Sequence, residues 1–250
     1  MVLGIKIQYD GRNYFGWQRQ TNAVTIQEKL EDAVSETLGY KVSIIGAGRT
    51  DSGVSARGQT ASIKLSAPIN IHIDNISRAI NSRLPDDIFV TEAKLFEFDF
   101  HARFDALFRE YSYTIILNRD VLKRHFSYWV KYNINLDILY DCAKFFHQDT
   151  DFTTFSKLNP DNNNPVCNIV MSRWEFIDDN TYIYRIKANH FLYGMVRSLV
   201  GTMIDAARGK RNIDEIHESL IAKDRNRNSP LAPPNGLCLE KIYYPDEFNF

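Results

Sequence analysis

The amino-acid sequence predicts an α+β protein made of two related βαββαβ-type domains with mostly antiparallel sheets. Three observations support this fold class. Segments with apolar residues at every second position alternate with segments in which they recur every three or four positions, as in strands and amphipathic helices. The same order of segments occurs in each half of the chain, and its 250 residues exceed the roughly 150 of an average domain. We expect domains at 1–105 and 106–250.

The N-terminal half begins with a strand, because Leu3, Ile5 and Ile7 alternate with other residues and share one face. Residues 25–28, Thr-Ile-Gln-Glu, form a capping box that starts a helix, and Gly39 suits the position just after that helix. The remaining predicted elements are strands at 42–45, 61–65 and 88–96 and a helix capped by Asp74.

The C-terminal half repeats this order. Its predicted elements are a strand at 111–117, a helix at 136–146, strands at 169–176 and 182–188, a helix at 192–209, a helix after Asn212 and a strand at 236–243. Asp178, Asp179 and Asn180 indicate a hairpin turn. The Asn-rich segment 159–168, with prolines at 160 and 165, is expected to be a loop.

The composition excludes several classes of protein. The chain is 44% hydrophobic and 24% charged, which excludes wholesale disorder. The longest stretch without Asp, Glu, Lys or Arg covers residues 228–239, and a membrane helix needs about 20 apolar residues. Charges near Met1 disfavour a signal peptide, and three widely spaced cysteines fit a reducing compartment. We expect a cytoplasmic protein that makes no membrane contact.

Charge is unevenly distributed along the chain, although it sums to −1. Residues 185–227 hold nine Lys or Arg against five Asp or Glu, and residues 103–131 hold six against three. Such sectors can form a face that binds a polyanion. They can equally be ordinary solvated surface, and charge alone does not choose between the two.

The loop 46–53, Gly-Ala-Gly-Arg-Thr-Asp-Ser-Gly, is the first candidate site. It matches neither a dinucleotide fingerprint, whose third glycine would fall at Asp51, nor a phosphate-binding loop ending in Gly-Lys-Ser/Thr. One interpretation is a glycine turn in which Asp51 bonds to the backbone. The other is a reactive carboxylate, kept ionised by a neighbouring guanidinium such as that of Arg49, which could also hold a phosphate.

Two further residues carry candidate chemistry. Arg197 interrupts an apolar helix, where it either points to water or pairs with a buried carboxylate. Helical spacing places it with Gly194 and Gly201 on a stripe of small residues. Tyr111 shares a strand face with Tyr113, a pattern typical of a core and also of a platform for an unstacked base. Cysteine and histidine spacings match no metal motif, so we predict neither metal nor cofactor.

Six blocks, taken together and in this order, resemble the TruA-type tRNA pseudouridine synthases over nearly the whole chain. They are residues 9–20 (YDGRNYFGWQRQ), 48–54 (GRTDSGV), 100–106 (FHARFDA), 109–113 (REYSY), 191–197 (FLYGMVR) and 232–239 (APPNGLCL). One position departs from the pattern, since Ser55 stands where the family usually has His. Arg49 and Asp51 both match it.

The resemblance implies a homodimer that isomerises uridine to pseudouridine in the tRNA anticodon stem-loop, at tRNA positions 38, 39 and 40, without metal or nucleotide. It implies a cleft between the domains, with Asp51 as the essential carboxylate and Arg197 as its partner. Tyr111 would stack on the flipped uracil, and Arg49 would hold the everted nucleotide's phosphate or fill the space that the nucleotide leaves.

Two other functions remain open from the residues alone. One is an RNA-binding protein of the same fold that catalyses no reaction. The other is a glycosidase or nuclease that uses Asp51, although such enzymes generally need a second carboxylate or a metal, and the sequence indicates neither.

Overall fold

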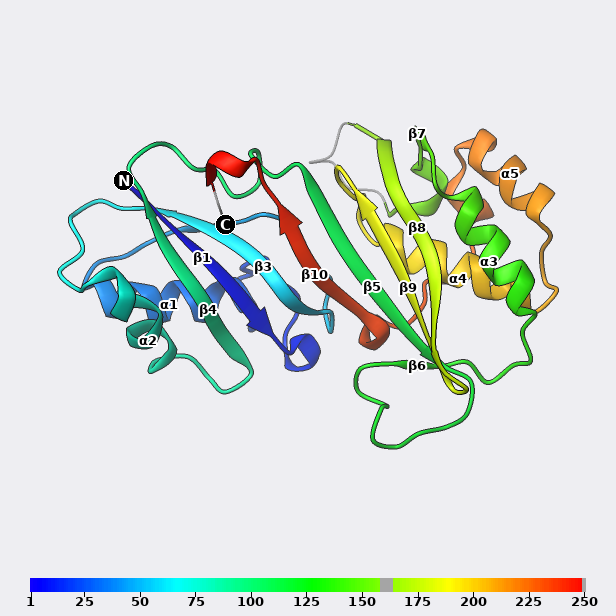
Figure 1. Ribbon diagram of the computed structural model, residues 1–250, viewed down its shortest axis with the longest axis horizontal. Coiled ribbons are helices and arrows are strands. Elements are labelled where there is room, and N and C mark those ends of the chain that lie inside the picture. The colour runs from blue at the N-terminus through cyan, green and yellow to red at the C-terminus, as the bar shows by residue number, and fades with distance from the viewer. Residues whose placement is uncertain (158–163, 249–250) are drawn as a thin grey trace. The chain divides into compact units, whose positions relative to one another are not determined.

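The computed structural model describes residues 1–157 and 164–248 (Figure 1). The chain forms two compact units. Unit 1 contains Met1–Leu107 and Leu239–Phe250, and unit 2 contains Phe108–Cys238. The predicted division at residue 105 assigned residues 239–248 to the second half, whereas in the structure they group with unit 1. None of the helices in the described part of the chain has the length and apolar character needed to cross a bilayer.

Unit 1 is a mostly antiparallel sheet with two helices on one face (Figure 1). The strand order is β4-β1-β3-β10, and β2 pairs with β3. The strands are β1 (Val2–Tyr9), β2 (Ile44–Gly46), β3 (Ser55–Lys64), β4 (Ile88–Phe96) and β10 (Leu237–Tyr243), of which residues 239–243 belong to this unit; the helices are α1 (Ile26–Leu38) and α2 (Ile73–Asn81). Leu3, Ile5, Ile26 and Leu30 are fully buried, so β1 and α1 share the core.

Unit 2 has the same layered construction, with sheet order β5-β9-β8-β7 (Figure 1). Its strands are β5 (Phe108–Ile116), β6 (Tyr128–Trp129), β7 (Asp149–Asp151), β8 (Val166–Asp178) and β9 (Thr181–Ala188); its helices are α3 (Leu136–Phe145), α4 (Met195–Ala207) and α5 (Ile213–Ala222). β6 runs parallel to β5, and the other pairs are antiparallel. Helix α4 is buried along almost its whole length because α3 packs against it.

Local signals for the ends of elements are largely confirmed. The Thr25 hydroxyl accepts a hydrogen bond from the Glu28 amide, and Gly39 adopts a left-handed conformation with φ +79°. Both halves of the capping box at Asn212 are present. The predicted hairpin turn lies between Asp178, the last residue of β8, and Thr181, the first of β9.

Two expectations about boundaries are wrong, and two short strands were not expected. Asp74 does not cap α2, because the helix begins at Ile73 and His72 is the residue before it. Helix α4 begins at Met195 rather than residue 192, because Gly194 has φ +71° and ends the preceding turn. The strands β6 and β7 were not predicted, since two or three residues are too few to show an alternating pattern. Of the predicted loop, residues 159–163 lie outside the described residues, while 166–168 start β8.

Candidate active site

The loop that carries Asp51 is held in place by hydrogen bonds from several directions. The side chain of Gln59 donates to the Gly48 carbonyl oxygen over 2.8 Å, and the Ala47 amide donates to the Thr60 carbonyl. The hydroxyls of Thr50 and Tyr9 lie 2.8 Å apart. These contacts tie the residues just before Asp51 to β1 and β3, so that the carboxylate projects from a preorganised loop.

The turn at residues 11–17 packs directly against this loop. A Cβ on Gly11 would lie 2.0 Å from the Val54 carbonyl oxygen, and one on Gly16 would lie 2.6 Å from the Thr50 carbonyl oxygen. Gly16 also has φ +88°, which glycine adopts without strain. The two glycines therefore permit a backbone approach that any other residue would block.

Arg49 and Asp51 lie two residues apart in this loop, Arg49 exposed and Asp51 half-buried. The Arg49 Nε donates to the side-chain oxygen of Gln18 over 3.0 Å. Ser55 accepts a hydrogen bond from the Gly11 amide over 3.1 Å, so the residue that departs from the family pattern has a structural contact of its own. Sequence reasoning assigned no role to Gln18, although it lies within the first quoted block.

In unit 2, Tyr111 and Tyr113 occupy one face of β5. Tyr111 is 7% exposed, and its ring meets that of Phe191 edge-on with centroids 5.2 Å apart. Tyr113 is fully buried, and its hydroxyl donates to the Pro233 carbonyl oxygen over 2.7 Å. Burial raises the pKa of Tyr113 well above its usual value, and the nearby positive charge of Arg197 acts in the opposite direction.

Arg197 lies in the first turn of α4 and is joined to the segment 230–233. Its Nε donates to the Ala232 carbonyl oxygen over 2.8 Å, and the Ala232 amide donates back to the Arg197 carbonyl over 3.0 Å. The expectation of a close approach at the small-residue stripe is confirmed, because a Cβ on Gly201 would lie 2.1 Å from the Pro230 carbonyl oxygen.

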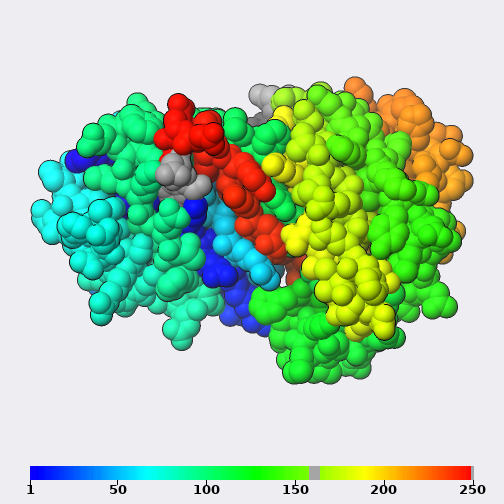
Figure 2. Space-filling model, viewed as in Figure 1, coloured from blue at the N-terminus to red at the C-terminus, as the bar shows by residue number. Residues whose placement is uncertain are grey.

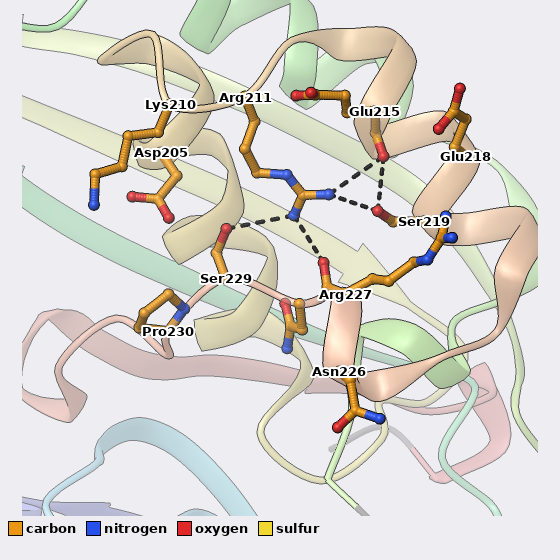
Figure 3. A pocket seen from close by; sticks show the side chains of 11 residues that line it. Asp205, Lys210, Arg211, Glu215, Glu218, Ser219, Asn226, Arg227, Ser229 and Pro230 are labelled. Carbon is orange, nitrogen blue, oxygen red and sulfur yellow. Dashed lines mark hydrogen bonds between the residues drawn. The ribbon is translucent and has the colours of Figure 1, made fainter.

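Residues 227–229, which come just before this segment, are held in place by hydrogen bonds from neighbouring side chains (Figure 3). The guanidinium of Arg211 donates to the carbonyl oxygens of Arg227 and Glu215, at 3.0 and 3.2 Å, and to the hydroxyl of Ser219. The side chain of Asn228 accepts from the hydroxyl of Ser198 over 2.8 Å. Arg211 lines a polar pocket of about 450 Å³. Its hydrogen bonds fix the path of the chain there.

The predicted site residues therefore form two groups. Arg49 and Asp51 share a loop of unit 1. Arg197 and Tyr113 belong to unit 2, where the charge of Arg197 lies close enough to influence the pKa of Tyr113. The pairing of Asp51 with Arg197 stays a prediction. Sequence reasoning did not identify the role of residues 230–233, whose signal was the Pro-Pro pair next to Ala232. The described residues contain no cluster of three or more His, Cys, Asp or Glu suited to a metal ion.

Comparison with known proteins gives consistent results. A family model described as tRNA pseudouridine synthase matches residues 5–105 and 148–245. The chain is 37% identical over 245 residues to "tRNA pseudouridine synthase A 2" of Clostridium perfringens, covering 97% of this chain and 99% of that protein. It is 40% identical over 243 residues to "tRNA pseudouridine synthase A" of Thermoanaerobacter sp., covering 96% and 98%. For the Bacteroides fragilis protein of that name the identity is 35% over 243 residues, covering 97% and 96%.

Proposed function

The chain belongs to the tRNA pseudouridine synthase family, and from this premise we propose that it isomerises uridine in the anticodon stem-loop of tRNA with Asp51 as the essential carboxylate. The observation that carries the proposal is the rigid loop around Asp51, since Thr50 and Gly48 are both fixed by hydrogen bonds to neighbouring strands. A surface loop that served only as a connection would not need this support.

The proposed reaction needs no redox partner and no source of phosphate energy. The bond from N1 of uracil to C1′ of the ribose breaks, the base turns, and C5 bonds to C1′. C5 loses its proton and N1 gains one, so substrate and product have the same atoms. Asp51 supplies the carboxylate that assists the breaking of the glycosidic bond, and a general base takes up the C5 proton.

The other site residues support this chemistry. Arg197 acts as the ion-pair partner of the Asp51 carboxylate and orients it toward the substrate. Tyr111 stacks against the flipped uracil. Arg49 is exposed at the loop and binds the phosphate of the everted nucleotide, because a guanidinium matches the geometry of a phosphate. Extruding the base costs a few kcal/mol, which contacts between basic side chains and the tRNA backbone offset.

The substrate region and the setting follow from the family resemblance. We place the modified uridines at tRNA positions 38, 39 and 40 and the enzyme in the cytoplasm as a homodimer. Mapping pseudouridine in tRNA from cells with and without this protein tests the positions directly. Loss of pseudouridine only outside the anticodon stem-loop would remove the positional assignment while leaving the reaction intact.

The decisive experiment is incubation of the purified protein with uridine-labelled tRNA, followed by digestion to nucleosides. We expect pseudouridine from the wild type and none from Asp51→Asn, with tRNA affinity kept within about tenfold because the change preserves the shape of the side chain. Asp179→Asn, the same change at an exposed hairpin turn, is the matched control and should be fully active.

Two other outcomes would each favour a different function, and a third would change the role of Asp51. Binding of tRNA without any pseudouridine would favour the RNA-binding protein that catalyses no reaction. Free uracil or cut strands would favour a glycosidase or nuclease. Full activity of Asp51→Asn would remove the role assigned to that carboxylate.

A further inference from the structure

We propose that residues 118–132, here named the basic loop, form a second contact with the tRNA substrate, in which exposed cations bind backbone phosphates and exposed apolar side chains cover the adjacent nucleotides. This inference rests on the proposed function. It assigns a role to a surface outside the residues that carry the reaction. The loop protrudes from unit 2 beside the β8–β9 hairpin, where Figure 2 shows it in green next to the yellow hairpin.

The charge of the basic loop suits a polyanion. It contains four Lys or Arg and one Asp, a net charge of +3. The Asp120 carboxylate accepts hydrogen bonds from the amides of Leu122 and Lys123, so it is used within the turn. Lys123 lies 3.3 Å from Asp178 of the hairpin.

Three cations of the loop remain available to a ligand. Arg119, Arg124 and Lys131 are exposed, and within residues 1–157 and 164–248 none of them forms an ion pair with a carboxylate. Exposed cations without acidic partners bind phosphate oxygens while giving up little existing interaction.

Aromatic rings lie among these cations. The Arg119 guanidinium and the Lys131 ammonium both lie over the Trp129 ring, at 5.7 and 5.5 Å from its centroid. Tyr132 is 50% exposed, and the guanidinium of Arg208 lies over its ring at 4.1 Å from the ring centroid. Rings and guanidinium planes among cations are the features with which proteins bind unpaired nucleotides irrespective of their sequence.

The basic loop is also ordered in advance of binding. The Ser127 hydroxyl donates to the Lys123 carbonyl oxygen over 2.7 Å, and the Asn235 side chain donates to the Arg124 carbonyl oxygen over 3.0 Å. The side chain of Asn180 accepts from the Asn118 amide, which joins the loop to the hairpin. A preordered loop loses little conformational entropy when it binds.

Exposed apolar side chains indicate that a ligand covers this surface. Leu122 is 90% exposed, Val121 56% and Phe126 53%. A second copy of this chain is the alternative occupant. A symmetric contact through this loop would bring two surfaces of charge +3 together, which is unfavourable, whereas RNA supplies the opposite charge.

The loop is connected to the segment that holds Arg197. The Asn235 side chain donates to the Arg124 carbonyl oxygen in the loop. Two residues before Asn235, the Pro233 carbonyl oxygen accepts from the Tyr113 hydroxyl. Ala232, the next residue back, bonds to Arg197. Four consecutive residues, 232–235, therefore link the basic loop to the segment that supports Arg197.

The test compares two triple variants with equal loss of charge. The first is Arg119→Gln, Arg124→Gln and Lys131→Gln. The control changes three exposed cations elsewhere in unit 2, by Lys210→Gln, Arg225→Gln and Arg227→Gln; the Arg227 carbonyl that Arg211 contacts is kept.

We expect the first variant to raise the Kd for tRNA by at least about tenfold at 0.1 M salt, and to reduce the slope of log K against log salt by about 0.7–0.9 for each phosphate that is no longer neutralised. Its rate of pseudouridine formation at saturating tRNA should match the wild type. The control should change the Kd by less than about threefold. Equal effects in both variants, or no effect in the first, would overturn the proposal.

Failure of the proposed function gives a different result. A wild type that forms no pseudouridine, combined with weak tRNA binding by the first variant alone, would refute the isomerase and leave the basic loop as an RNA contact. Leu122→Ser distinguishes the alternative occupant, because this exposed position can change without affecting the core. Weaker tRNA binding at unchanged molecular mass in sedimentation equilibrium supports the proposal. A lower mass with unchanged tRNA affinity would assign the surface to a second copy and overturn it.

Discussion

Gly201→Ala tests the packing that joins Arg197 to its supporting segment. The new Cβ would lie 2.1 Å from the Pro230 carbonyl oxygen and 3.3 Å from the Ala232 amide nitrogen. An ordinary contact needs about 3.5 Å, so residues 230–232 must move by roughly 1.4 Å. A shift of that size breaks the two hydrogen bonds between Arg197 and Ala232.

The magnitude follows from opposing terms. Replacing glycine by alanine inside a helix gains about 1 kcal/mol. Overpacking of a buried backbone costs about 1–3 kcal/mol, and each broken hydrogen bond costs about 1 kcal/mol. The free energy of unfolding should therefore fall by about 2–4 kcal/mol, and catalytic activity should fall as well because the Arg197 guanidinium loses its support.

The assay is urea unfolding followed by circular dichroism, combined with pseudouridine formation below the unfolding transition. Gly209→Ala is the control, because its Cβ would meet no atom within 4 Å and its φ is +75°. Its cost of about 1 kcal/mol comes from the backbone alone, so activity should be unchanged. A Gly201→Ala protein as stable as the wild type, or as active as Gly209→Ala, would refute the reasoning.

Three further predictions concern single side chains. Tyr111→Phe should keep most of the base stacking and Tyr111→Ala should lose it, so equal activity of the two would contradict the stacking role. Arg197→Lys should lower kcat by at least about tenfold, because a point charge cannot replace a planar guanidinium; wild-type kcat would contradict this. Burial raises the pKa of the Cys167 thiol to about 12. Labelling by a disulfide reagent at pH 8 should therefore be slow in the native protein and fast in urea. Because the folded state favours the neutral thiol, the stability that Cys167 contributes is complete below about pH 9 and is lost as the pH rises toward 12. Urea titrations from pH 8 to 11 should show this loss for the wild type and less of it for Cys167→Ala.

The order of strands and helices could be predicted because its signals are local. The alternation in β1, the capping box at Asn212 and the hairpin turn before Thr181 each involve residues within a few positions of one another. The errors have a local cause as well, since His72 precedes α2 where the sequence offered Asp74, a better capping residue. An N-cap preference is worth only about 1 kcal/mol, and in the structure Ile73 and Asp74 already belong to the helix, so it begins before the better capping residue.

The candidate site could be predicted only as separate residues. The sequence showed that Asp51 lies among glycines and that Arg197 interrupts an apolar helix. It did not show which residues hold them, because these partners are distant in sequence. The Thr50 hydroxyl meets Tyr9, forty-one positions away, and the Arg197 side chain meets Ala232, thirty-five positions away.

The sequence by itself determined the element order, the element ends with strong caps and the chemical character of the site, since each depends on hydrogen bonds and periodicities that short segments satisfy alone. Only the tertiary structure decided that residues 239–248 group with unit 1 and that residues 230–232 pack against Gly201. These arrangements arise from burial and close packing between distant segments, whose free energy depends on the shape of the assembled unit rather than on any local pattern.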